Sequence, residues 1–397
     1  MRRLRRVLVL LVVVLAAAGA LWLHHRAGPA VTYQIVDLGV ISGATNSQGF
    51  AINAAGEVTG FLHYPGLAGP YYTHAFLWRD GRMTDLGALP GLPRSSGVAL
   101  NAQGTVVGGA MGTSRKRLLK GSHASRTPGS GFVYEGGRMK ALPALPGNPI
   151  SGASAINDRG QVVGSGYSVS GGGTRAFLFQ RGAVRDLGTL GPLDGLTDQV
   201  GSYANGINGS GQIVGTSEAS GGEKNVKHAF LYSQGTMTDL GTLSGYQSSG
   251  GVAINDQGQV AGSASKTDGD DSDLIRRQAF LWQRGTMRSL GTLPGYQDSY
   301  ATGLNSRGQV VGMASTPIPF LSFLNAHPSS GSPPPDDPPR PFLYENGRMT
   351  DLNALLPAHS GWVLEEAHGI NDKGQIVGTG RHDGKTRAFV LTPMPVK

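Results

Sequence analysis

Two carboxylates and a histidine stand close together near the C-terminal end of the chain, at Glu365, Glu366 and His368. A carboxylate and an imidazole within hydrogen-bond reach of each other can take up and return a proton. The remaining histidines are scattered along the chain. The group at 365–368 therefore indicates either polar contacts to a ligand or, as the alternative, the acid/base group of a glycan-active hydrolase or lyase.

Four tyrosines lie within three residues of a recurring serine: Tyr203, Tyr246, Tyr296 and Tyr300. Aromatic rings and hydroxyls around a shallow pit suit a glycan, which stacks on the rings and hydrogen-bonds to the hydroxyls. Serines that instead bond to nearby backbone groups are the other interpretation. The recurring serines are Ser47, Ser95, Ser151, Ser202, Ser249 and Ser299, and Glu365 occupies the seventh such place.

The sequence lacks the residues that several kinds of catalysis and ligand binding require. The chain has no cysteine, which excludes disulfides, a thiolate nucleophile and cysteine-ligated metals. Gly384-Lys385-Thr386 resembles part of a phosphate-binding loop, but Thr379 stands where that loop needs a glycine. Carboxylates suit calcium, but the acidic run Asp268, Asp270, Asp271 and Asp273 lacks EF-hand spacing, so calcium binding stays open. We identify no catalytic motif, predict no cofactor and assign no metal site.

The positive charge has a local origin. The chain has a net charge of +8, but five of its basic residues lie in the first 30 residues. Five more belong to one stretch, as Arg115, Lys116, Arg117, Lys120 and Arg126. Without both groups 24 basic residues face 26 acidic ones, so the charge does not favour a nucleic-acid partner.

The N-terminus resembles an export signal. Four arginines within the first six residues precede an apolar run over residues 7–23. Seventeen residues in a helix measure about 26 Å, which leaves both a cleaved signal peptide and a retained signal-anchor open for residues 1–30. Either way the rest of the chain is expected outside the cytoplasm: secreted, periplasmic or at the cell surface. Membrane contact is expected only through residues 7–23, if the leader is retained.

The elements that position these residues follow from an internal repeat. An Ala-Ile-Asn triplet or a variant of it occurs seven times, with a glycine three residues after the asparagine and another four residues later. Two further blocks recur between the triplets, as in His74-Ala75-Phe76-Leu77-Trp78 and Met83-Thr84-Asp85-Leu86-Gly87. Each block is short, rich in β-branched and aromatic residues, and bounded by turn residues. The asparagines are Asn53, Asn101, Asn157, Asn208, Asn255, Asn305 and Asn371.

Each repeat predicts four antiparallel strands, named A to D here. Asn-x-x-Gly favours a type I turn between A and B, so the asparagines are interpreted as turn formers. A glycine in second place, as in Asp80-Gly81, suits a type I′ hairpin between C and D. Glycine or alanine stands two and four residues before each asparagine, as crowded innermost strands require.

Seven such units predict an all-β, seven-bladed β-propeller. Residues 33–40 read as a D strand with no unit before them, so they complete the last blade and close the ring. We therefore expect residues 31–397 to form a single domain. Its units span about 41–90, 91–146, 147–191, 192–244, 245–294, 295–356, and 357–393 together with 33–40.

These blocks resemble the HAF-type extracellular repeat family of bacteria. The resemblance rests on His-Ala-Phe-Leu-Trp, Asp-Leu-Gly-Thr-Leu and Ala-Ile-Asn-x-x-Gly-Gln-Val-Val-Gly, and covers essentially residues 33–391. The first histidine of the motif occurs only at His74 and His228. The family implies export and a repeated β-fold, and it implies no established reaction.

The turns divide the predicted ring into two faces. The A–B and C–D turns are uniformly short, whereas the B–C and D–A connections are long and variable, which is where binding residues usually lie. One B–C insertion is basic, one is acidic, and one at 317–341 contains Phe320, Leu321, Phe323 and Leu324, a potential hook for a protein partner. The predicted ligand-binding residues on this face are Tyr203, Tyr246, Tyr296, Tyr300, Glu365, Glu366 and His368.

The sequence thus predicts an exported, monomeric, non-enzymatic binding or scaffold module of the bacterial envelope. Its expected partner is a polysaccharide or an envelope protein.

Overall fold

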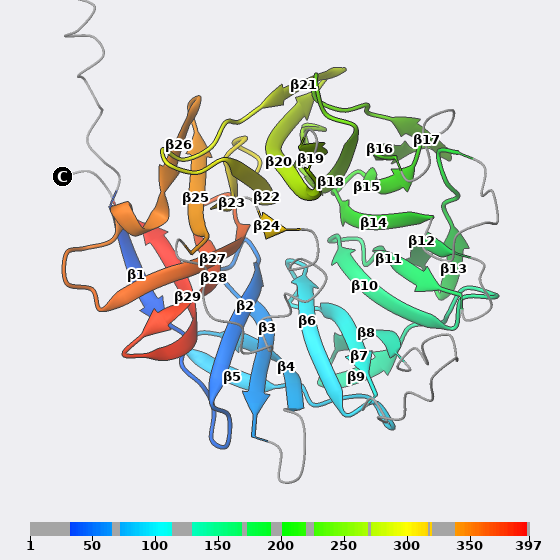
Figure 1. Cartoon of the computed structure of the whole chain (residues 1–397). Coiled ribbons are helices and arrows are strands. Elements are labelled where there is room, and N and C mark those ends of the chain that lie inside the picture. The colour runs from blue at the N-terminus through cyan, green and yellow to red at the C-terminus, as the bar shows by residue number, and fades with distance from the viewer. Residues whose placement is uncertain are drawn as a thin grey trace, which may run out of the picture.

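The computed structural model describes residues 32–65, 72–112, 129–168, 173–191, 201–219, 226–268, 271–316, 318–319 and 338–394. Seven antiparallel sheets, each with four main strands, stand around a central axis (Figure 1). A single 3₁₀ turn, η1 (Leu352–Leu355), is the only helical element within those ranges. The predicted seven-bladed β-propeller is confirmed. The N-terminal leader, the basic stretch and most of the 317–341 insertion lie outside the described residues.

The strands of each blade follow one another from the axis outward in the order A, B, C, D. Blades 1 to 4 contain β2 (Asn46–Ile52), β3 (Val58–Tyr64), β4 (Tyr72–Arg79) and β5 (Arg82–Asp85); β6 (Arg94–Leu100), β7 (Val106–Met111), β8 (Gly129–Glu135) and β9 (Arg138–Ala141); β10 (Ile150–Ile156), β11 (Val162–Tyr167), β12 (Thr174–Gln180) and β13 (Ala183–Asp186); β14 (Ser202–Ile207), β15 (Ile213–Glu218), β16 (Lys227–Ser233) and β17 (Thr236–Asp239). Blades 5 to 7 contain β18 (Ser248–Ile254), β19 (Val260–Asp268), β20 (Asp271–Gln283) and β21 (Thr286–Ser289); β22 (Asp298–Leu304), β23 (Val310–Ser315), β25 (Arg340–Glu345) and β26 (Arg348–Asp351); β27 (Trp362–Ile370), β28 (Ile376–His382), β29 (Lys385–Pro393) and β1 (Tyr33–Asp37).

The ring closes as the sequence predicts. β1 pairs antiparallel with β29, with Tyr33 opposite Pro393 and Asp37 opposite Phe389. The Tyr33 side chain is buried at this seam, and burial raises its pKa to about 12. The first and last described strands of the chain therefore share one sheet.

The two kinds of tight turn have the predicted geometry. In the A–B turns the glycine N–H donates to the asparagine carbonyl, at 3.0 Å between Gly56 and Asn53, and Gly56 has a φ of 92°. In the C–D turns both central residues have positive φ, 50° at Asp80 and 75° at Gly81, as a type I′ hairpin requires.

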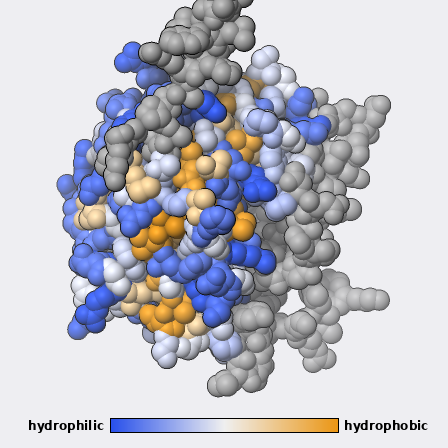
Figure 2. Space-filling model, turned by 90° about the vertical axis from the view of Figure 1, so that its left-hand side faces the viewer, coloured by the Kyte–Doolittle hydropathy of each residue, from blue (hydrophilic) through white to orange (hydrophobic). Residues whose placement is uncertain are grey.

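Apolar packing between adjacent blades forms the core. Seven phenylalanines of the C strands are fully buried, and each packs among residues of two blades; Phe76, for example, lies with Val377 and Ala388. Burial of one such side chain contributes about 2–3 kcal/mol. The innermost strands approach so closely that a Cβ on Gly49 would lie 2.7 Å from a Val377 methyl group. On the side of the ring that faces the viewer in Figure 2, the coloured surface is mostly hydrophilic with scattered apolar patches.

The hairpin that carries the acidic run pairs with the start of the 317–341 insertion. β19 and β20 extend into a long hairpin in which Asp268 lies opposite Asp271. β24 (Ile318–Pro319), from the start of the 317–341 insertion, pairs with β20 at Leu274 and Ile275. The side chains that would test calcium binding, and the rest of the hydrophobic hook, lie outside the described residues.

Candidate functional site

The repeated asparagines form a closed ring of hydrogen bonds between blades. Each side-chain oxygen accepts backbone N–H groups of its own turn; Asn53, for example, accepts from Ala55 and Glu57. Each Nδ2 donates to the backbone carbonyl of the asparagine in the next blade, over distances from 2.9 to 3.4 Å. The last of these bonds joins Asn371 to Asn53. The interpretation as turn formers was thus incomplete, because the same side chain also fastens neighbouring blades.

A cavity of about 250 Å³ lies where these turns meet on the axis. Asp158, Asp256 and Asp372 line it, and each carboxylate accepts a backbone N–H from the preceding blade at 2.7–2.8 Å. These carboxylates are therefore also part of the blade-to-blade connections.

The recurring serines have a structural role. All six are buried, with exposed fractions of 0–7%, and each accepts a backbone N–H from strand C of the preceding blade. Five of them also donate to a carbonyl at the end of strand D in that blade, as Ser47 does to Gly39 at 2.7 Å. The hydroxyls therefore bond to backbone groups, but across the junction to the preceding blade and not locally, and they are not presented to a ligand.

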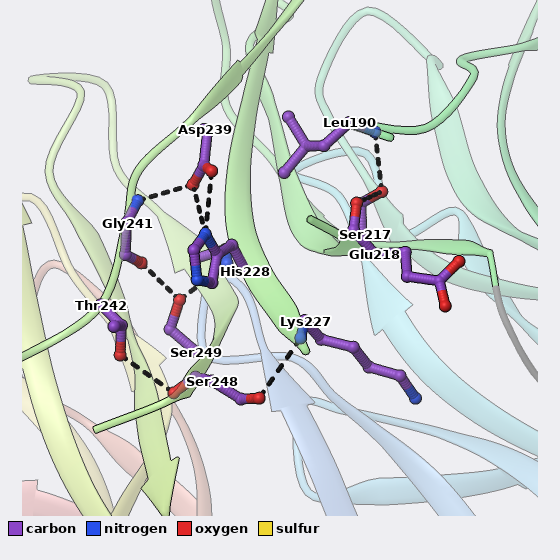
Figure 3. A network of polar contacts seen from close by, with 11 residues as sticks. Leu190, Ser217, Glu218, Lys227, His228, Asp239, Gly241, Thr242, Ser248 and Ser249 are labelled. Carbon is purple, nitrogen blue, oxygen red and sulfur yellow. Dashed lines mark hydrogen bonds and ion pairs between the residues drawn. The ribbon is translucent and has the colours of Figure 1, made fainter. Parts of the chain in front are cut away.

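Histidine–aspartate pairs lie on the outer strands. His228 Nδ1 lies 2.8 Å from Asp239, and Asp239 also accepts the Gly241 N–H (Figure 3). Ser249 lies nearby and completes the set of residue types of a serine hydrolase, but its hydroxyl bonds to the Gly241 carbonyl and the Ala229 N–H. The arrangement therefore joins strands and provides no activated nucleophile.

The equivalent histidine in blade 1, His74, pairs with Asp85 at 2.9 Å. This hydrogen bond raises the pKa of His74, and a second bond to the Pro93 carbonyl adds to the rise. Burial opposes ionisation of Asp85, but bonds from His74, Tyr64 and the Gly87 N–H outweigh it and hold the pKa of this carboxyl low.

A different cluster lies on the innermost strands of blades 6, 7 and 1. His368 and Glu366, both on β27, are joined by a 3.1 Å contact between Nε2 and Oε2, and their side chains are 24% and 39% exposed. The Phe50 ring of blade 1 meets the His368 ring edge to face, with centroids 4.8 Å apart. We call Tyr300, Glu366, His368 and Phe50 the axial cluster.

The charges of the axial cluster are coupled. The contact with His368 lowers the pKa of Glu366 in spite of burial, so its carboxylate is ionised at neutral pH. Burial raises the pKa of Tyr300 to about 12, and the charge of Glu366 adds to this rise. The cluster therefore presents a fixed acceptor, an imidazole and a phenol that stays protonated.

Thr379 lies beside the axial cluster. It is directly opposite Glu366 in the β27–β28 register and is 2% exposed. Its Oγ1 is buried, and it has no hydrogen-bond partner among the described residues. The protein encloses this hydroxyl, so it packs beside the cluster and does not face solvent.

Glu365 has its partner outside the cluster. It forms an ion pair with Arg381 at 2.7 Å, with 37% of its side chain exposed. The register shift between Leu364 and Glu366 makes Glu365 a bulge residue, so the two adjacent carboxylates do not simply alternate between the sides of the sheet. Both are partly exposed, and they pair with different residues.

Each of the four predicted tyrosines has a cationic neighbour. Lys227, Lys266 and Arg277 lie over the rings of Tyr203, Tyr246 and Tyr300, at 5.9, 5.4 and 5.9 Å from the centroids. Arg340 donates to the Tyr296 hydroxyl at 3.3 Å.

The tyrosines do not form a single pit. Tyr203 and Tyr300 lie on innermost strands, whereas Tyr246 and Tyr296 precede the innermost strands and pack against the apolar cores of blades 5 and 6. Only Tyr300 joins Glu366 and His368.

Sequence reasoning missed the aromatic wall beside the axial cluster. Phe61 packs edge to face on Phe50 at 5.3 Å and on His63 at 4.9 Å, and burial lowers the pKa of His63. Phe50 and His368 share a place three residues before the repeat asparagine, where strand A bulges. That shared spacing was the available signal.

Two negative findings concern the described residues. None of their His, Asp and Glu side chains gather in groups of three or more that could hold a metal ion. The same residues include no helix with the length and apolar character needed to span a membrane.

Comparison with known proteins supports the fold. Scans against protein-family models and curated proteins found no match. The β-propeller domain of the Trilobed protease from Pyrococcus furiosus matches with a TM-score of 0.52 at 7% identity, over 89% of this chain and 94% of that chain. A putative TolB from Agrobacterium tumefaciens has a TM-score of 0.42 at 13% identity, over 79% and 95%. A Mycobacterium tuberculosis puromycin-hydrolyzing peptidase has 0.46 at 10%, over 92% and 54%.

At such identities the first of these similarities shows the fold alone, and the other two TM-scores are too low to carry an argument. The protein is therefore a seven-bladed β-propeller, closed by its N-terminal strand.

Proposed function

We propose that this protein is an exported, non-enzymatic binding module of the HAF-type repeat kind, and that its ligand is a polysaccharide held at the axial cluster. The observation that carries the proposal is the partly exposed Glu366–His368 pair, whose imidazole the Phe50 ring meets edge to face. Repeated structural positions elsewhere in the ring have their partners within the protein, as the serines do.

The chemistry of the cluster suits a sugar. The ionised Glu366 accepts hydrogen bonds from hydroxyl groups, and His368 and Tyr300 offer further polar contacts. Phe50 and Phe61 add aromatic surface, on which the C–H faces of a sugar ring can stack. A few polar groups beside aromatic surface are the usual composition of a small-ligand site.

Binding is favoured over catalysis because the cluster lacks a suitably placed acid. Glycan hydrolysis in most families needs two carboxyl groups, one of them protonated. The lowered pKa of Glu366 keeps it ionised, and Glu365 is paired with Arg381 instead. A Glu–His pair is still able to transfer a proton, which keeps a hydrolase or lyase as the alternative.

Export is supported by the sequence. Four N-terminal arginines followed by the apolar run 7–23 are typical of a signal peptide or signal-anchor. We propose a location in the periplasm, on the cell surface or outside the cell.

A glycan array probed with the full chain and with two variants tests the proposal. We expect binding to one class of bacterial polysaccharide, weakened about tenfold by Glu366→Gln because a charged acceptor is lost. The matched control Glu365→Gln should bind normally. Equal binding by all three proteins would contradict the proposed site, and release of glycan products that Glu366→Gln abolishes would establish the enzyme instead.

A further inference from the structure

The junctions between blades contain a repeated contact on their outer part. In the junction of blades 3 and 4, Arg185 of β13 reaches the next blade and its guanidinium lies 5.5 Å from the centroid of the Tyr232 ring. An Nη2 group of Arg185 also donates to the Tyr232 hydroxyl. In the junction of blades 5 and 6, Arg288 lies 6.0 Å from the Tyr344 ring centroid in the same way.

The junction of blades 1 and 2 keeps the tyrosine and lacks the arginine. Tyr134 occupies the place of Tyr232 and Tyr344, but Thr84 stands where Arg185 and Arg288 stand. A cavity of about 370 Å³ opens there, lined by both Thr84 and Tyr134. Within the described ranges, no cation lies over the Tyr134 ring.

The turn of blade 2 leaves this cavity open to solvent. Its C–D turn is Gly136-Gly137, and both glycines line the cavity. In the other tight C–D turns a side chain stands at the first place, such as Arg181 or Gln234. The volume falls within the range of about 300–1,000 Å³ that is usual for ligand pockets.

One lining residue suits a cation. Tyr134 lines the cavity, and a guanidinium is attracted to the face of a tyrosine ring. Arg79 also lines the cavity, but its charge is offset by an ion pair with Glu57.

We infer that the groove between blades 1 and 2 binds the arginine side chain of a partner polypeptide. The incoming guanidinium takes the place that Arg185 fills in the junction of blades 3 and 4. Arginine is favoured over lysine because a planar guanidinium stacks on a ring and donates to its hydroxyl at the same time, as Arg185 does. The site lies away from the axial cluster and does not depend on the proposed polysaccharide binding.

Short peptides test the inference on the full chain. The probe is acetyl-Gly-Arg-Gly-amide, and the matched peptides carry citrulline or lysine in place of arginine. Binding is followed by saturation-transfer NMR. We expect the citrulline peptide to bind at least about tenfold more weakly, because it keeps the shape and loses the charge. Equal binding of the arginine and citrulline peptides would overturn the inference.

A substitution that copies the filled junctions provides the second arm. Thr84→Arg should place the protein's own guanidinium over Tyr134 and weaken arginine-peptide binding about tenfold. Thr238→Arg, the same change in the junction of blades 4 and 5, is the control and should leave binding unchanged. If Thr84→Arg does not fold, Tyr134→Leu serves in its place. Unchanged affinity in the folded groove variant would reject the site.

Discussion

Two positions on the innermost strands differ in how strictly the blades repeat them. At the tight-turn end, seven copies of one asparagine make one bond each to the next blade, and all seven are buried, with 3–6% of each residue exposed. Three residues earlier on the same strands the side chains differ from blade to blade, as Phe50, Thr302 and His368 show. There His368 and Glu366 form a pair whose side chains stay partly exposed.

The comparison indicates that residues repeated in every blade and residues that vary between blades have different roles in this ring. A residue repeated in every blade is one that a sevenfold ring needs to hold itself together. A rigid ring then permits change elsewhere, which is why variable positions on a fixed scaffold tend to carry binding. The following predictions test that division.

The largest effect is expected from removing one member of the asparagine ring. Asn255 accepts two backbone N–H groups and donates to Gln259 and to the Asn305 carbonyl. Asn255→Ala leaves several buried groups unpaired and should lower the free energy of unfolding by about 3 kcal/mol. Urea unfolding followed by circular dichroism measures the loss.

Asn101 is the matched control for that substitution. Its bond to the next blade is longer, at 3.4 Å, and Thr105 replaces the glutamine that accepts from Asn255. Asn101→Ala should therefore cost about half as much. Equal losses would show that the turn, and not the bond between blades, is what the asparagine stabilises.

The fold could be predicted from sequence because its signals are local. Asn-x-x-Gly and Asp80-Gly81 encode turns within a few residues, and residues 33–40 stand out as a strand without a unit. The bond from Asn53 to Asn101 joins residues 48 positions apart, and no local pattern encodes it. Its repetition in all seven copies was visible, but the turn alone was enough to explain it.

The candidate site was predicted only in part, for a similar reason. The structure brings Tyr300, Glu366 and His368 near one another, and it pairs Glu365, which was expected with them, with Arg381. The register shifts in β27 interrupt the alternation of sides along the strand, and a sequence does not reveal where a strand bulges. Phe61 and Thr379 come from strand B, beside a cluster predicted from strand A alone.

The serines at the start of the innermost strands should show the next largest effect. Ser249 bonds to the Ala229 N–H and to the Gly241 carbonyl, so Ser249→Ala leaves two buried groups of the preceding blade unpaired. We expect a loss of about 1.5 kcal/mol in urea unfolding. Ser96→Ala, at a partly buried serine that is not repeated, should change stability by less than about 0.5 kcal/mol.

The axial cluster should respond in the opposite sense, with little change in stability and a large change in binding. Glu366→Gln keeps the size of the side chain and removes a charge that is 39% exposed, so solvent already screens its contact with His368. We expect less than about 1 kcal/mol in thermal unfolding. If Glu366→Gln lowered the free energy of unfolding as much as Asn255→Ala does, the cluster would be stabilising the ring. A position that varies between blades would then not mark a binding site.

The smallest effect is expected from His74, a residue that varies between blades and that we expect to have a structural role. His74 occurs in only some copies of its motif, yet it is joined to Asp85 within one blade, with both side chains less than one-third exposed. The raised pKa of His74 makes its stabilising effect complete below the ordinary value of 6.5 and lost as the pH rises through the folded-state value. The lowered pKa of Asp85 makes its effect complete above the ordinary value of 3.8 and lost as the pH falls.

The pair should therefore stabilise the protein most between about pH 4 and pH 6.5. Replacing the histidine by His74→Gln, the residue that blade 5 has at this place, should lower the free energy of unfolding by about 0.5 kcal/mol at pH 5.5. The difference from the unaltered protein should shrink by pH 8.5, because the imidazole is then neutral in both states. Urea titrations at the two pH values measure it. A difference that grows with pH would mean that His74 is stabilised in its neutral form, and the ion pair would then not be what joins strands C and D.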